Sequence, residues 1–213
     1  HGVAPYKISN EEVLKEIDYL QNQLGFNIKY KSEITSKEQI KQLEQNYDAI
    51  FLGVGLGKTK DLKIEGEDKD GIIGAVEFIE ALREKQHKMK VPQKVVVLGG
   101  GNTAMDAASE SARMGAKKVV LAYRNSKEKM GAYGFEYDLA ISAGVDSLFH
   151  VTPLAIVGNG KVEGVKFAKT ELVDGKLKTN MNNTFTVRCD LVIKATGQTK
   201  LGYLYALIDD LKI

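Results

Sequence analysis

The chain has 213 residues, 43% hydrophobic and 27% charged, which is typical of a globular protein of one or two domains. Its formal net charge is +2, with lysines and acids interleaved, so nucleic acid and anionic membranes are not expected as partners. No apolar run approaches the ~20 residues of a membrane span. The single cysteine, Cys189, excludes a redox disulfide and an iron–sulfur cluster built by this chain alone, and it fits a reducing, cytoplasmic location.

The first 50 residues predict two helices and a short strand. Ser9 can cap a helix over residues 10–24 that ends at Gly25. A strand is expected at residues 26–30. Thr35 and Glu38 are spaced as a capping box for the second helix.

Two separate segments share the pattern of an acid, three apolar residues and a turn ending in glycine. They are Asp48–Gly55 and Asp190–Gly197. Each predicts a strand whose carboxyl end bends close to a ligand, as in open α/β sheets that bind nucleotides. The candidate cofactor-binding residues from these turns are Gly53, Gly55, Ala195, Thr196 and Gly197. Two short strands ending in glycine can also match by chance.

A charged, glycine-containing loop is expected at 58–71, followed by a helix near 74–88 and a connector over 85–93. Residues 95–98 (Val-Val-Val-Leu) then predict a parallel strand that is buried on both faces.

The turn after this strand is the most informative motif in the sequence. Gly99, Gly101 and Ala104 occupy the G-x-G-x-x-G/A positions, which allow a tight turn, close approach of the backbone to a pyrophosphate, and close helix packing. A helix ending near Gly115 and a strand at 118–124 complete a β-α-β unit. The residues expected to hold the pyrophosphate are Gly99, Gly100, Gly101, Asn102 and Thr103. The alternative is a glycine-rich turn that binds no ligand.

The end of the second strand indicates which dinucleotide is bound. An acid there accepts hydrogen bonds from the ribose of NAD, whereas Arg124 suits the 2′-phosphate of NADP. Lys127 can add positive charge, although a solvated basic loop is the alternative. Asp106, in the first turn of the phosphate-binding helix, either complements the helix dipole or approaches the nicotinamide.

The remaining segments predict scaffold. A helix over 135–143, a strand at 145–149 and hairpins turning at 158–160 and 174–175 precede the strand that begins at Leu191. Cys189 is expected to be a small packing residue.

Other chemistries find no support in the sequence. Tyr123 and Lys127 have the Tyr-x-x-x-Lys spacing of short-chain dehydrogenases, but they follow the second strand, near the adenosine end of the cofactor. His1, His87 and His150 are too scattered for a metal site. We therefore expect no catalytic side chain and no metal ligands in this chain.

Several phrases of the sequence resemble the flavin and NADPH module shared by the small subunit of glutamate synthase and the amino-terminal part of dihydropyrimidine dehydrogenase. The phrases are Gly99–Ala108, Ala116–Arg124, Lys129–Tyr133, Phe51–Gly57 and Ile64–Asp68. The resemblance implies that NADPH, rather than NADH, gives a hydride to FAD. Electrons then pass to an iron–sulfur-containing segment or a catalytic partner subunit.

The resemblance also implies the domain organisation. The expected fold class is α/β, with a Rossmann-like NAD(P)-binding domain, an inserted antiparallel β-meander and part of an FAD domain. Residues 1–92 would be a partial flavin-domain segment, 93–197 the NAD(P)H-binding domain and 198–213 the return to the flavin domain. Because the family's flanking flavin segments would lie before His1 and after Ile213, we expect a fragment of a longer flavoprotein.

The predicted function is the NADPH-binding portion of a flavin-dependent oxidoreductase. A non-catalytic NAD(P)-binding or redox-sensing module is the alternative from another class, and a bound flavin would separate the two. A stand-alone dehydrogenase would need a general acid or base that the sequence does not reveal. The final electron acceptor and the oligomeric state stay open.

Overall fold

The computed structural model describes residues 2–85 and 88–211, which divide into two compact units. Unit 1 comprises residues 1–10 and 58–197, and unit 2 comprises residues 11–57 and 198–213. The helices are α1 (Asn10–Leu24), α2 (Lys37–Asn46), α3 (Ala75–Glu84), α4 (Asn102–Arg113), α5 (Gly134–Ser142) and α6 (Gly202–Tyr205). The strands are β1 (Ile72–Gly74), β2 (Lys94–Leu98), β3 (Lys118–Tyr123), β4 (Val145–Phe149), β5 (Val151–Val157), β6 (Gly164–Val173), β7 (Lys176–Arg188) and β8 (Leu191–Lys194).

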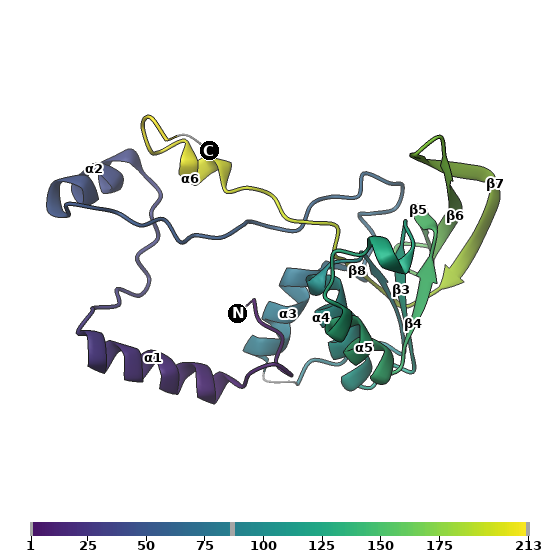
Figure 1. Ribbon diagram of the computed structural model, residues 1–213, viewed down its shortest axis with the longest axis horizontal. Coiled ribbons are helices and arrows are strands. Elements are labelled where there is room, and N and C mark those ends of the chain that lie inside the picture. Colours follow the sequence, from purple (N-terminus) through teal and green to yellow (C-terminus); the bar gives the residue numbers. More distant parts are fainter. Residues whose placement is uncertain (1, 86–87, 212–213) are drawn as a thin grey trace. The chain divides into compact units, whose positions relative to one another are not determined.

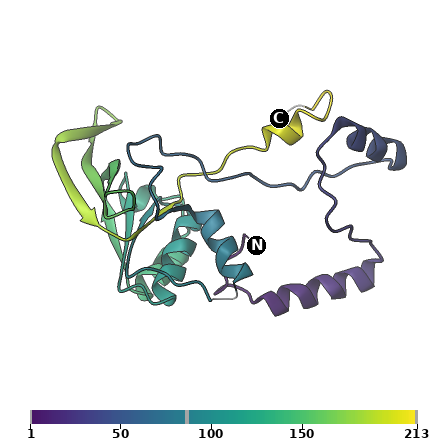
Figure 2. The ribbon, with the colours of Figure 1, turned by 180° about the vertical axis from the view of Figure 1, so that it is seen from behind.

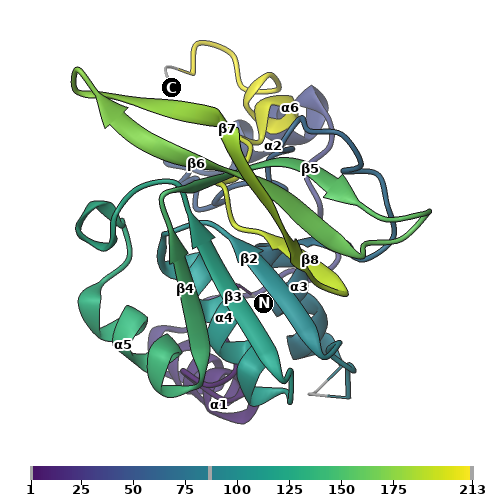
Figure 3. The ribbon, with the colours of Figure 1, turned by 90° about the vertical axis from the view of Figure 1, so that its right-hand side faces the viewer.

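Unit 1 is built on a five-stranded parallel sheet in the order β1-β8-β2-β3-β4 (Figure 3). In the central strand, Val96 lies opposite Val120 on one side and Val192 on the other. This confirms the prediction of a parallel strand at 95–98. The short helix α4 leads from β2 to β3 and completes the predicted β-α-β unit.

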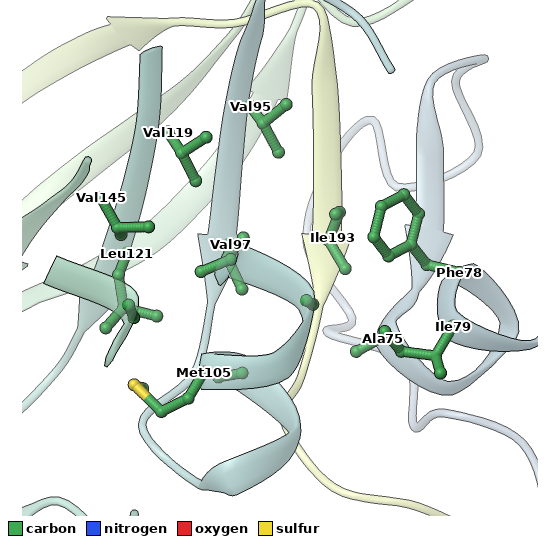
Figure 4. Close-up of a cluster of buried hydrophobic side chains, with 14 of the residues drawn as sticks. Ala75, Phe78, Ile79, Val95, Val97, Met105, Val119, Leu121, Val145 and Ile193 are labelled. Atoms are coloured by element: carbon green, nitrogen blue, oxygen red, sulfur yellow. The ribbon is translucent and has the colours of Figure 1, made fainter. Parts of the chain in front are cut away.

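Both faces of this sheet are covered, as the unbroken apolar run of β2 predicted. Val95 and Val97 pack with residues of α3 and α4 such as Phe78 and Met105 (Figure 4). On the other face, Val96 and Leu98 join a second cluster with residues of β5 and β6 such as Phe167. Alternate side chains of one strand therefore belong to two cores, with the helices on one face and the antiparallel strands on the other (Figure 1).

The predicted hairpins form a three-stranded antiparallel sheet in the order β5-β6-β7. Phe167 and Phe185 stack across β6 and β7, with ring centroids 5.9 Å apart. The fold class is therefore α/β with an antiparallel addition, as predicted. The pairing of β6 with β7 extends to the turn at Asp174–Gly175, the second of the two predicted turns.

Unit 2 has three helices and an extended connection between α1 and α2 (Figure 2). The capping box of α2 lies one residue later than predicted, because the Ser36 hydroxyl accepts from the Gln39 N–H and the Gln39 side chain accepts from the Ser36 N–H. The expected helix near 74–88 is α3, which ends at Glu84; residues 86–87 lie outside the described range.

The prediction of strands at 26–30 and 48–55 was wrong, since neither segment forms a strand. An extended segment becomes a strand only when its backbone pairs with a neighbour. The side chains at 50–52 and at Val54 are also exposed, Phe51 by 94%. Both segments contain the apolar residues typical of strands. Within the described residues, however, no neighbouring strand pairs with them, and the apolar side chains at 50–52 and Val54 are not buried in a core.

Across the described residues, no helix is both long and apolar enough to cross a membrane.

Candidate functional site

The glycine turn after β2 is shaped by two close approaches. Gly99 has φ +155, and a Cβ there would lie 2.5 Å from the Ala195 carbonyl oxygen. A Cβ on Gly100 would lie 2.5 Å from the Tyr123 ring. Both positions therefore require glycine, because the turn is packed between the ends of β8 and β3.

Gly101 differs from its neighbours because it faces open space. Apart from the adjoining backbone and its chain neighbours, no described atom lies within 4 Å of the position where its Cβ would be. Gly101 is also the N-cap of α4, and its carbonyl accepts from the Ala104 N–H at 2.9 Å and the Met105 N–H at 3.2 Å. The N–H groups of Asn102 and Thr103 precede these bonds and have no acceptor within the helix, so they can bind an anion.

A short loop is tied across this turn. The Ala132 N–H donates to the Gly100 carbonyl at 3.1 Å, and the Tyr133 N–H donates to the Asn102 side-chain oxygen at 2.9 Å. The Asn102 side chain is thus used to hold the loop. Gly131, at the start of the loop, lines the adjoining cavity.

Arg124 follows the last residue of β3 and is exposed. Its backbone carbonyl accepts a hydrogen bond from the Thr170 hydroxyl at 2.6 Å. The Tyr123 hydroxyl donates to the Lys129 carbonyl at 2.7 Å. Hydrogen bonds at Tyr123 and at the Arg124 carbonyl therefore fix the backbone here, while the exposed Arg124 side chain is accessible to a ligand.

A cavity of about 500 Å³ joins these features at the carboxyl ends of β2, β3 and β8. This volume lies in the ordinary range for a small-molecule site, and the edge is where open parallel sheets bind ligands. The lining residues are Lys60, Asp61, Leu62, Ile64, Leu98, Gly99, Gly100, Gly101, Ala122, Tyr123, Arg124, Gly131, Val151, Thr152, Pro153, Ala195 and Thr196.

Six of the predicted cofactor-binding residues meet in this cavity: Gly99, Gly100, Gly101, Arg124, Ala195 and Thr196. Others are not among its lining residues. Asn102 and Thr103 begin α4, Gly197 accepts the Lys60 N–H through its carbonyl, and Lys127 lies 4.3 Å from the Tyr137 ring. Gly53 and Gly55 belong to unit 2.

Asp106 is buried and contacts the amino-terminal segment. Its carboxylate accepts a hydrogen bond from the Tyr6 hydroxyl and pairs with the Lys7 ammonium, both at 2.8 Å. Lys7 also pairs with Glu136. Burial and the bond to Asp106 raise the pKa of the Tyr6 hydroxyl above its usual range. Asp106 thus has a role that its sequence context did not indicate: its contacts with Tyr6 and Lys7 hold the amino-terminal segment against α4.

Two stretches of the cavity wall were not predicted from the sequence. Residues 60–64 come from the charged loop, and residues 151–153 from the start of β5. Neither carries a recognisable ligand-binding motif. Ile64 and Gly131 did belong to phrases that carried the family resemblance.

The remaining sequence predictions concern metals and the cysteine. Among the described residues, no group of three or more His, Cys, Asp or Glu side chains could hold a metal ion; His1 and His87 lie outside that range. Cys189 is free and buried, and burial raises the pKa of its thiol to about 12. It is a packing residue, as predicted, and stays protonated near neutral pH.

The cavity has the features of a site for the phosphates of a dinucleotide. Gly101 is open at the start of a helix, Arg124 lies in the same lining, and Gly99 and Gly100 leave no room for a side chain in the turn. Fold and site together define an α/β nucleotide-binding module.

The chain belongs to the pyridine nucleotide-disulphide oxidoreductase family, whose pattern matches residues 3–201. It is 36% identical to the glutamate synthase [NADPH] small chain of Escherichia coli over 92% of this chain and 45% of that protein. It is 34% identical to the NADPH-Fe(3+) oxidoreductase subunit beta of Geobacter sulfurreducens, over 92% of this chain and 31% of that protein. The chain thus spans less than half the length of these curated relatives.

Solved structures show the same fold. FprA of Mycobacterium tuberculosis in complex with NADPH superposes with a TM-score of 0.72 at 20% identity, covering 92% of this chain and 60% of FprA. The thioredoxin reductase of T. acidophilum gives a TM-score of 0.52 over 69% of this chain and 43% of that protein, also at 20% identity. At these identities the likeness describes the fold.

Proposed function

We propose that this chain is the NADPH-binding portion of a flavin-dependent oxidoreductase that passes a hydride from NADPH to FAD and electrons onward to a partner. The observation that carries the proposal is that one cavity at the carboxyl edge of the parallel sheet collects six of the predicted binding residues. It joins the glycine turn of β2, Arg124 after β3 and Ala195–Thr196 after β8.

The order of these strands supports an assignment of each end of the cofactor. β2 lies between β3 and β8. The pyrophosphate would lie at Gly99–Gly101 and the N-terminus of α4, with the 2′-phosphate at Arg124 beyond β3. The nicotinamide half would then extend toward Ala195 and Thr196 after β8. In this assignment Gly53 and Gly55, which belong to unit 2, are on the flavin side of the protein, whereas Lys60, Asp61, Leu62 and Ile64 line the NADPH cavity.

The bound cofactors would supply the redox chemistry, with a hydride moving from nicotinamide to flavin. The chain's own residues bind and orient NADPH through charge-assisted hydrogen bonds and helix N–H groups. The preference for NADPH over NADH rests on Arg124, since no acid follows β3 at that position.

A partner that receives the electrons is part of the proposal. Two relatives are named as a small chain and a subunit beta, which supports function within a larger assembly. Cys189 alone cannot ligate an iron–sulfur cluster, because such clusters need about four thiolates. We therefore place the cluster in another segment or a partner subunit.

Two experiments test the proposal. Calorimetric titration of NADPH into the chain should show one binding site, weakened by Arg124→Ala. Anaerobic mixing of NADPH with the longer, flavin-containing protein should bleach the flavin absorbance. An absence of NADPH binding to the chain would remove the proposed function. Binding without flavin reduction in the longer protein would favour a non-catalytic NAD(P)-binding module.

A further inference from the structure

One wall of the cavity is a segment without helix or strand. Residues 60–64 contribute Lys60, Asp61, Leu62 and Ile64 to the lining, yet none of these residues lies in a regular element. Lys63, within this segment, has φ +59, a left-handed backbone conformation that is unfavourable for residues other than glycine. Such a conformation persists only where the surrounding contacts hold it.

The carboxylate of Glu67 supplies those contacts. One oxygen accepts the Leu62 N–H and the other accepts the Lys63 N–H, each at 2.7 Å. Thr59, just before the wall, is held in the same way: its N–H and hydroxyl donate to Glu77 at 3.0 and 2.7 Å. Side-chain carboxylates therefore replace the ladder bonds that a strand would provide.

Glu67 is in turn held by Lys194. The Lys194 ammonium lies 2.6 Å from a Glu67 oxygen and 3.5 Å from an Asp61 oxygen. Only 11% of the Lys194 side chain and 15% of the Glu67 side chain are exposed. Lys194 is the last residue of β8 and directly precedes Ala195 and Thr196 in the cavity. A largely buried ion pair thus joins two walls of the same site.

We propose that the Lys194–Glu67 ion pair positions the 60–64 wall against the end of β8 and thereby sets the affinity of the cavity for a dinucleotide. This inference rests on the proposed NADPH-binding function. Both residues are positioning residues, because neither lines the cavity. Removing either charge leaves the other buried without its partner, which is unfavourable, so the wall relaxes outward and its ligand contacts are lost.

The test uses Lys194→Met and Glu67→Gln in the 213-residue chain, with two readouts. Amide hydrogen exchange measures the wall directly: protection of the Leu62 and Lys63 amides should fall about tenfold or more in both variants. The dissociation constant for NADPH should rise about tenfold, because small displacements of binding groups are costly. Lys194→Arg keeps the charge, so it should retain most of the amide protection at Leu62 and Lys63 and most of the affinity for NADPH.

Lys7→Met is the matched control, because Lys7 also forms ion pairs in unit 1, at 2.8 Å to Asp106 and Glu136. It should lower stability without changing exchange at Leu62 and Lys63 or NADPH affinity. If Lys7→Met weakens NADPH binding as much as Lys194→Met does, the Lys194 effect is general destabilisation and the proposal is overturned.

Failure of the two proposals can be told apart. If the wild-type chain does not bind NADPH, the proposed function fails while the exchange readout still tests the role of the ion pair. If NADPH binds but exchange and affinity are unchanged in Lys194→Met and Glu67→Gln, the positioning role is overturned alone.

Discussion

The Thr170 hydroxyl of β6 donates to the backbone carbonyl of Arg124 at 2.6 Å, which ties the antiparallel sheet to the end of β3. Thr170 is only 4% exposed, and its own N–H donates to the His150 carbonyl at 2.9 Å. The β5-β6-β7 addition therefore holds the backbone of the residue that we propose to select NADPH.

Thr170→Val tests this link, because it keeps the side-chain shape and removes the hydroxyl. The Arg124 carbonyl would lose its partner, so we expect a loss of about 1–3 kcal/mol in the free energy of unfolding. We also expect a smaller preference for NADPH over NADH. Urea unfolding and calorimetric titration of both nucleotides measure the two effects. Thr184→Val, at an exposed position of β7, should change neither.

Arg124→Ala should remove most of the preference for NADPH. A guanidinium–phosphate hydrogen bond is worth roughly 1.5–3 kcal/mol, which corresponds to about one to two decades in affinity. NADH binding should stay nearly unchanged, and added salt should narrow the difference because the pair is exposed. Lys127→Ala is the control. If Arg124→Ala and Lys127→Ala reduce the preference for NADPH equally, the preference comes from the general positive charge of the loop. If the wild type binds NADPH and NADH with equal affinity, the assignment of NADP is removed.

Gly101→Ala and Gly99→Ala should separate binding from folding. The Gly101 position is open, so an added methyl meets no clash, and replacing this N-cap glycine by alanine should cost no more than about 1 kcal/mol of stability. It would nevertheless obstruct the approach of the phosphates and weaken NADPH binding. Gly99→Ala meets the Ala195 carbonyl at positive φ and should cost about 1–3 kcal/mol of stability. Thermal unfolding with NADPH titration measures both, and unaltered binding in Gly101→Ala would argue against the phosphate site.

Asp106→Asn decides between a structural and a nicotinamide role for this residue. The substitution removes the charge that pairs with Lys7, so we expect a loss of about 1–3 kcal/mol in unfolding free energy. NADPH affinity should stay the same, because Asp106 does not line the cavity. A clear loss of affinity in a fully folded variant would show that Asp106 reaches the cofactor.

Acid should destabilise the loop that forms the cavity wall. Burial alone would raise the pKa of Glu67, but the bonds from Lys194 and two backbone N–H groups outweigh it and hold the pKa below its usual range. Glu77 behaves similarly through its bonds from Thr59. Because the folded pKa values are lowered, this stabilisation is complete above the ordinary value of about 4.3 and is lost as the pH falls through the lowered values.

The double variant Glu67→Gln/Glu77→Gln should therefore be less stable than the wild type at pH 7 and should lose less stability on acidification. Urea midpoints measured across this range test it. Parallel pH curves for the two proteins would contradict the assignment of these carboxylates.

The sequence by itself determined the central β-α-β unit and its glycine turn. The run at 95–98, the spacing of Gly99, Gly101 and Ala104, and the strand predicted at 118–124 are local patterns, because periodicity and glycine conformation depend on neighbouring residues. The same locality explains why the hairpin turns and the parallel, doubly covered character of β2 were predictable.

Only the tertiary structure decided the contacts between residues far apart in the chain. The segment 48–55 has the pattern of a strand but forms none, because strand formation depends on a pairing partner that its own sequence does not encode. Asp106 contacts Tyr6, 100 residues away, and Lys194 contacts Glu67 across 127 residues. Such pairs carry no periodic signal, so the wall at 60–64 and the role of Asp106 emerge only when packing brings the elements together.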